Sequence, residues 1–155
     1  MKLALIEAKK ANDRDEVPVG AVITDQKNNI ISIDGNRMRE LNDPTAHAEI
    51  QVIRQACNIL KTSKLFNFSL FTTLEPCAMC AMAVSLSGIK NLYFAAEDRK
   101  KGSLKGIEPD SKSQVTMLYE NNKPVKVTSV VISTQHSKDL NQDKVRELII
   151  PYIKK

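Results

Sequence analysis

The stretch LFTTLEPCAMCAMAVSLS, residues 70–87, decides the fold because a short apolar strand runs directly into a helix. Leu70–Leu74 has the composition of a buried strand. Glu75-Pro76-Cys77 then opens a helix whose alanines, Ala78 and Ala81, are small enough for close packing. A strand followed at once by a helix is typical of an α/β domain.

The rest of the chain repeats this alternation. Upstream, Asp43-Pro44-Thr45 predicts a helix start with an aspartate cap and a proline in the first turn. The helix after it carries one apolar stripe, formed by Ile50, Ile53, Cys57 and Leu60. Further elements are an amphipathic helix at 2–13, a hairpin of strands 17–24 and 30–33, strands 92–96 and 125–132, and a helical pattern at 138–150.

This order predicts one α/β domain over residues 1–155, with a mixed sheet covered on both faces. The first two strands should be antiparallel because a short polar turn joins them. The later strands should be parallel because helices connect them. Residues 98–124 are rich in Lys, Gly, Ser and Asn, and their pattern does not assign them to a helix or a strand.

Composition narrows the class of protein. The chain has 155 residues, 42% of them hydrophobic, which is ordinary for one globular domain. No apolar run reaches the roughly 20 residues that a membrane span needs, and the N-terminus lacks a signal-peptide pattern. We therefore expect a cytoplasmic protein, in which three cysteines stay reduced. The net charge of +5 permits a nucleic-acid partner without requiring one.

Two short motifs carry the chemistry: His47-Ala48-Glu49 and Pro76-Cys77-Ala78-Met79-Cys80. Both lie at predicted helix N-termini, where free N–H groups and the helix dipole stabilise thiolates. Two cysteines three residues apart can reach one point, and His47 supplies a third ligand. Three protein ligands leave the fourth position of a tetrahedral Zn²⁺ open, as catalytic zinc requires.

Catalytic zinc lowers the pKa of a water in that position from about 15.7 toward roughly 7. A side chain must then take the proton from the water and pass it to the leaving group. Glu49 is the candidate, because a poorly solvated carboxylate has a raised pKa and can move protons in both directions.

Other interpretations of the cysteines are weaker. A structural zinc site needs a fourth protein ligand, and the remaining candidates are Cys57 and His136. Cys57 falls on the apolar stripe and is interpreted as core, whereas His136 lies in a polar stretch and is interpreted as surface. A redox pair would leave His47 and Glu49 unexplained.

The paired motifs match the H-x-E…P-C-x-x-C signature of zinc nucleobase deaminases. The wider sequence resembles the bacterial tRNA-specific adenosine deaminases from near residue 3 to about residue 103. The resemblance is carried by VPVGAVI (17–23), GNRMRELNDPTAHAEI (35–50), TLEPCAMCA (73–81) and FAAEDRKKGS (94–103). It implies a three-layer α/β/α cytidine-deaminase-like fold with a central mixed five-stranded sheet. It also implies one Zn²⁺ per subunit, a homodimer, and a tRNA anticodon stem-loop as substrate.

The resemblance also suggests substrate contacts. Asn36 matches an asparagine that hydrogen-bonds the base, although it could simply suit the turn after Gly35. The pocket wall would include Pro18, Val19 and Ala48. Asp98 would lie near the RNA backbone or act as a cap. Phosphates would be bound by a basic cluster, which could equally be a solvated surface: Arg99, Lys100, Lys101 and Lys105.

Three functions follow. The first is deamination of adenosine to inosine at the tRNA wobble position, with the adenine flipped out to reach the metal. The second is deamination of a free base such as guanine, because guanine deaminases share a very similar DPTAHAE and EPCxMC text. The third is a non-catalytic, zinc-stabilised RNA-binding subunit, against which the intact Glu49 argues. The segment 107–124 and Pro151 depart from the tRNA deaminase pattern.

Overall fold

The computed structural model describes residues 1–96, 98, 101 and 102 with their side chains, and the backbone of three short strands at 119–120, 123–124 and 126–129. Helices are α1 (Lys2–Asp13), α2 (Ala48–Leu60) and α3 (Ala78–Ser87). Strands of the main sheet are β1 (Gly20–Thr24), β2 (Ile30–Gly35), β3 (Ser69–Leu74), β4 (Asn91–Ala96) and β7 (Lys126–Ser129). A separate pair consists of β5 (Tyr119–Glu120) and β6 (Lys123–Pro124).

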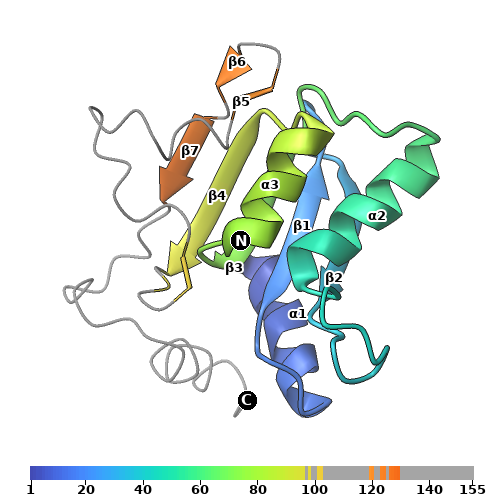
Figure 1. Ribbon diagram of the computed structural model, residues 1–155, viewed down its shortest axis with the longest axis vertical. Coiled ribbons are helices and arrows are strands. Elements are labelled where there is room, and N and C mark those ends of the chain that lie inside the picture. The colour runs from blue at the N-terminus through green and yellow to red at the C-terminus, as the bar shows by residue number, and fades with distance from the viewer. Residues whose placement is uncertain (97, 99–100, 103–118, 121–122, 125, 130–155) are drawn as a thin grey trace.

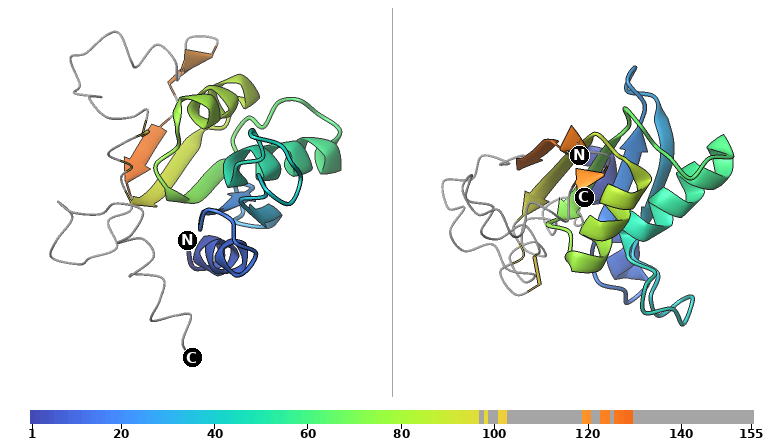
Figure 2. Two further views of the ribbon diagram at one scale, coloured as in Figure 1. Left: turned by 60° about the horizontal axis from the view of Figure 1, so that its bottom comes forward. Right: turned by 45° about the horizontal axis from the view of Figure 1, so that its top comes forward.

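The main sheet is mixed and has the order β2-β1-β3-β4-β7. β1 pairs antiparallel with both β2 and β3, whereas β3–β4 and β4–β7 are parallel. Helix α1 covers one face, and α2 and α3 lie side by side on the other (Figures 1 and 2). The three-layer α/β/α arrangement with a mixed five-stranded sheet is therefore confirmed. Among the described residues, no helix is long and apolar enough to cross a membrane.

A core of buried aliphatic side chains joins the layers. Ile23, Leu70 and Leu92, from three neighbouring strands, are fully buried. Val52 from α2 and Val84 from α3 belong to the same cluster, so the two site helices are fixed on one apolar surface. Burying such side chains contributes about 1.5–3 kcal/mol each relative to leaving them exposed.

Helix α1 packs very closely on β1 at Gly20. A Cβ added there would lie 2.0 Å from the Ala4 carbonyl oxygen and 2.5 Å from the Ala8 nitrogen. β1 therefore packs directly against α1 because Gly20 has no side chain.

Several boundaries differ from those expected. The helix predicted to begin near residue 44 begins at Ala48. Asp43 instead closes a separate turn, in which its Oδ1 accepts hydrogen bonds from the backbone nitrogen and hydroxyl of Thr45, both at 2.7 Å. The first strand begins at Gly20, not Val17. The expected helix at 138–150 lies outside the described residues.

Candidate metal centre

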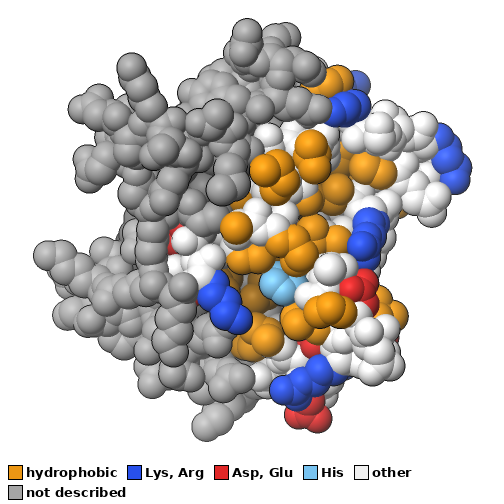
Figure 3. All heavy atoms as spheres, in the orientation of Figure 1, with side chains coloured by type: hydrophobic (Ala, Val, Ile, Leu, Met, Phe, Trp, Pro, Cys, Tyr) orange, Lys and Arg blue, Asp and Glu red, His pale blue; other side chains and the backbone are white. Residues whose placement is uncertain are grey.

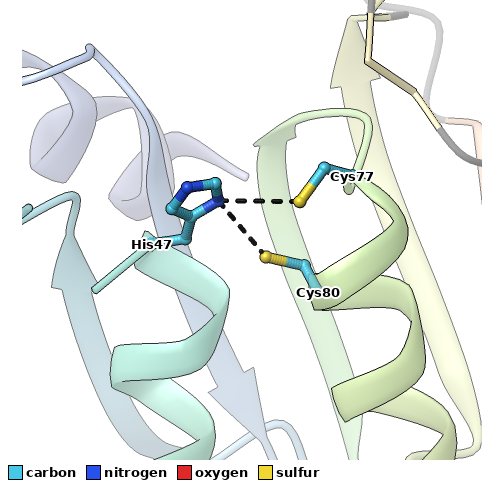
Figure 4. A group of neighbouring side chains, drawn as sticks. All are labelled: His47, Cys77 and Cys80. Atoms are coloured by element: carbon cyan, nitrogen blue, oxygen red, sulfur yellow. Dashed lines mark hydrogen bonds between the residues drawn. The ribbon is translucent and has the colours of Figure 1, made fainter. Parts of the chain in front are cut away.

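Two helix N-termini place the metal-ligating side chains. His47 is the N-cap of α2, and Cys77 is the N-cap of α3. Both have extended backbone and neither side chain caps its own helix, so both are free to point outward. Cys80 lies one turn into α3 and is fully buried. The three side chains converge from the two neighbouring helices (Figure 4).

Their distances fit one tetrahedral ion. His47 Nδ1 lies 3.7 Å from Cys77 Sγ and 3.5 Å from Cys80 Sγ. Tetrahedral zinc, with bonds of about 2.3 Å to sulfur and about 2.05 Å to nitrogen, requires nitrogen–sulfur separations of about 3.6 Å. Within the part of the chain described with side chains, this is the one group of three potential ligands close enough to share an ion. Cys57 is not among them and packs against the core, as predicted, while His136 lies outside the described residues.

Hydrogen bonds among the three ligands shift their pKa values in different directions. Hydrogen bonds from Cys80 and His47 lower the pKa of the Cys77 thiol to about 4. The hydrogen bond between the two free cysteine side chains, together with burial, raises the pKa of the Cys80 thiol. The hydrogen bond to Cys77 raises the pKa of the His47 imidazole. Among the three ligands, Cys77 therefore takes the thiolate form most readily, which is the form that binds a metal.

Glu49 lies beside the ligands, in the first turn of α2. Its side chain is buried, with 4% of its surface exposed. Burial raises the pKa of this carboxyl to about 7. A carboxyl with a pKa near neutrality can both accept and donate a proton at working pH, which is what general acid–base catalysis requires.

A cavity of about 150 Å³ opens onto these groups. Seven of the residues proposed from the sequence line it: Val19, Asn36, His47, Glu49, Cys77, Asp98 and Lys101. Four lining residues were missed: Val17, Met38, Leu74 and Glu75.

Two of the residues proposed as pocket wall do not line the cavity. The Val19 nitrogen donates to the Val17 carbonyl at 2.7 Å, a tight turn that puts Pro18 at its apex and both valines toward the cavity. Ala48 is fully buried in the core. Arg99, Lys100 and Lys105 lie outside the described residues.

Asp98 and Glu75 build the wall beside Cys77. Buried Glu75 accepts a hydrogen bond from the Asp98 nitrogen at 3.0 Å, and Asp98 Oδ1 accepts one from the Lys101 nitrogen at 3.0 Å. Gly102 pairs with Cys77 as an isolated bridge, and a Cβ on it would lie 2.3 Å from Glu75 Oε2. Asp98 thus closes a turn that holds Lys101 at the cavity.

The sheet, the His/Cys/Cys group with one open side, and the adjacent acidic residue define a zinc-dependent deaminase class. Comparison with known proteins agrees. Residues 1–96 match the family model of the cytidine and deoxycytidylate deaminase zinc-binding region. The chain is 53% identical over 104 residues to a tRNA-specific adenosine deaminase of Agrobacterium fabrum, covering 67% of this chain and 68% of that one.

Solved structures show the same fold. One, from a study of A-to-I editing by tRNA:A34 deaminases, matches with a TM-score of 0.72 at 45% identity, over 83% of this chain and 95% of that one. A guanine deaminase from Bacillus subtilis matches with a TM-score of 0.61 at 29% identity, over 88% of this chain and 86% of that one. The chain belongs to the cytidine and deoxycytidylate deaminase family, among the relatives of the tRNA-specific adenosine deaminases.

The C-terminal part carries a different similarity. Residues 79–155 match the family model of the S-adenosylmethionine synthetase central domain. A 66-residue stretch, 43% of this chain, is 65% identical to an S-adenosylmethionine synthase of Pelagibacter ubique and covers 17% of that protein. The deaminase resemblance, expected to end near residue 103, covers two thirds of the chain in the Agrobacterium comparison.

Removing one ligand should abolish metal binding. We expect Cys80→Ala to lower bound zinc from about one ion per chain to less than a tenth of that, because two ligands hold zinc poorly. Cys57→Ala is the matched control and should keep its zinc. Metal analysis of both purified variants is the measurement. Retention of zinc by Cys80→Ala, or its loss from Cys57→Ala, would contradict the assigned ligand set.

Proposed function

We propose that this chain hydrolyses the amino group of adenosine in tRNA, giving inosine at the wobble position and releasing ammonia. The observation that carries the proposal is the buried Glu49 beside an open-sided group of His47, Cys77 and Cys80. The 53% and 45% identities to relatives described as tRNA adenosine deaminases support this substrate class.

The reaction adds water at C6 of adenine and removes ammonia. His47, Cys77 and Cys80 would hold Zn²⁺, which would supply a water with its pKa lowered to near neutrality. Glu49 takes a proton from that water and delivers it to N1 of the base. It then transfers the second proton to the departing amine. A carboxyl whose pKa lies near 7 is suited to both transfers.

The cavity is of a size for part of a substrate. Its volume of about 150 Å³ is below the roughly 300–1,000 Å³ of pockets that enclose a whole drug-sized ligand. We infer that a single flipped base enters while the rest of the nucleic acid stays outside. Asn36 would hydrogen-bond the base, and Val19 would pack against it. The Ala48 backbone N–H remains a proposed contact to the base.

The outer face suits a phosphate backbone. Lys101 is exposed at the cavity, and basic side chains lie on the face that carries the histidine (Figure 3). Lys101 would bind RNA phosphate, whose negative charge dominates such affinity. The same role is proposed for Arg99, Lys100 and Lys105. The cytoplasmic location stays a prediction.

The alternative functions receive less support. Guanine deamination would use the same site, but the B. subtilis guanine deaminase is only 29% identical to this chain. A non-catalytic RNA-binding subunit has no need for a buried carboxyl beside the metal ligands.

The residues that bind the metal and move protons lie in the first two thirds of the single domain expected over 1–155, whereas β7 of the main sheet comes from the remainder. The matching family model ends at residue 96, and the three metal ligands and Glu49 all precede that residue. The match covers only 17% of the synthase, so it does not support synthase activity in the C-terminal third of this chain.

We also propose a homodimer with the RNA crossing both subunits. Exposed apolar side chains on α2 and α3 support it: Ile59 is 60% exposed, Met82 39% and Leu86 59%. Large contiguous apolar patches mark interaction surfaces, whereas exposed apolar side chains that are scattered singly need no explanation.

Replacing the proton-transfer residue should abolish activity without removing the metal. Glu49→Gln should lower inosine formation in an anticodon stem-loop by at least 100-fold while zinc stays at one per chain. The assay is run beside free guanine, cytosine and adenosine. Full activity in Glu49→Gln, or turnover of guanine with an untouched stem-loop, would overturn the proposed function.

Whether residues 104–155 contribute to zinc binding can be tested by exchange. Residues 104–155 are replaced by the C-terminal segment of the Agrobacterium relative. Zinc content should remain one per chain because every ligand comes from the retained part. If the exchanged protein folds but loses zinc, residues 104–155 contribute to the metal site and the proposed ligand set is incomplete.

A charge on the apolar helix surface should weaken the dimer. Light scattering should give twice the mass of one chain for the unmodified protein. Leu86→Glu should shift it toward one chain, whereas Ile30→Glu, 49% exposed on β2, should not. A monomeric unmodified protein would contradict the dimer.

A further inference from the structure

Glu16 is a buried carboxylate immediately before the pocket wall, and it accepts three hydrogen bonds. Only 4% of its surface is exposed. Its Oε2 accepts from the side-chain nitrogen of Asn36 at 3.0 Å. Its Oε1 accepts from the backbone nitrogens of Arg39 at 2.8 Å and Glu40 at 2.9 Å. Both carboxylate oxygens are therefore occupied by donors that belong to one loop, residues 36–40.

The first of these bonds fixes how Asn36 faces the cavity. An asparagine amide has a donor end and an acceptor end that occupy nearly the same volume, so only its partners set the orientation. An ionised carboxylate accepts and never donates, so the Asn36 nitrogen must turn toward Glu16 and its oxygen away from it. The backbone is fixed as well, since the Asn36 nitrogen donates to the Val19 carbonyl at 2.9 Å.

The other two bonds fix the turn that carries Met38. Met38 lies between Asn36 and Arg39 in sequence and lines the same cavity. With the nitrogens of Arg39 and Glu40 bound to one oxygen, the turn is held at a set distance from Glu16. Glu16 thus acts on a polar wall residue and an apolar one together.

We propose that Glu16 is a positioning residue that sets the amide orientation of Asn36 and the place of Met38, and thereby the fit of the base. This inference rests on the proposed contact between Asn36 and the base. Glu16 itself is absent from the cavity lining, so its effect on the substrate passes through the loop.

A second buried glutamate offers a matched control. Glu7 is 9% exposed and accepts a bond from Lys10 Nζ at 2.8 Å within α1, on the other face of the sheet from α2 and α3. Replacing it with glutamine removes a charge of the same kind at a site that does not line the cavity.

The experiment is a double-mutant cycle of Glu16→Gln and Asn36→Ala, with kcat and KM measured on an anticodon stem-loop. Glutamine at position 16 has one acceptor end and one donor end. Its donor end would face N–H groups that the Glu16 carboxylate accepts from. We expect KM to rise about 10- to 100-fold with a smaller change in kcat. In the Asn36→Ala background the same change should cost less, about threefold or below, because only its effect on Met38 remains. Zinc content should be unchanged throughout.

Equal losses in both backgrounds would overturn the inference, because Glu16 would then act independently of Asn36. So would unchanged kinetics in Glu16→Gln, or full activity in Asn36→Ala. These outcomes leave the proposed function standing, since Glu49→Gln tests it separately. Glu7→Gln should match the unmodified protein. If Glu16→Gln does not fold, Glu16→Asp keeps an acceptor-only group, and its effect must still be smaller in the Asn36→Ala background.

Discussion

The metal site requires three side chains to converge on one point and to leave one coordination position open. The fold meets this requirement with two helices on one face of the sheet. His47 and Cys77 are N-caps of two helices that lie side by side on one face of the sheet, and Cys80 lies one turn further on. A shared aliphatic core under α2 and α3 sets the spacing between the caps. Packing interactions distant from the cavity therefore determine whether the sulfur and nitrogen atoms lie about 3.6 Å apart.

The same constraint explains the polar residues around the site. Thiolates and a catalytic carboxyl need opposite environments within a small volume. Hydrogen bonds from Cys80 and His47 stabilise the thiolate form at Cys77, whereas complete burial favours the neutral form of Glu49. Glu75 and Glu16 stay at the edges, where each accepts backbone or amide hydrogen bonds and organises a loop. Two acidic residues that sequence patterns did not single out thus shape the walls.

Much of this was predictable from the sequence because short spacings determine helix faces and caps. The mixed sheet and the core position of Cys57 were confirmed, and the three predicted ligands do lie close enough together to share one ion. The sequence could not reveal the carboxylate of Glu75 beside Gly102, because it depends on contact between distant segments, and the tight turn at Val17–Val19 carries no sequence signal that leaves Pro18 out of the cavity lining. The helix start predicted at Asp43 was wrong because an aspartate can close a turn as readily as it caps a helix.

X-ray absorption at the zinc edge of the loaded, substrate-free protein tests the central claim most directly. The account predicts two sulfur ligands at about 2.3 Å, one imidazole nitrogen at about 2.05 Å, and a fourth light-atom ligand that does not come from the chain. That fourth ligand should exchange when an inhibitor is added. A first shell with three sulfurs, or with a second imidazole closing the site, would contradict the account, because the metal would then be structural and unable to take part in deamination.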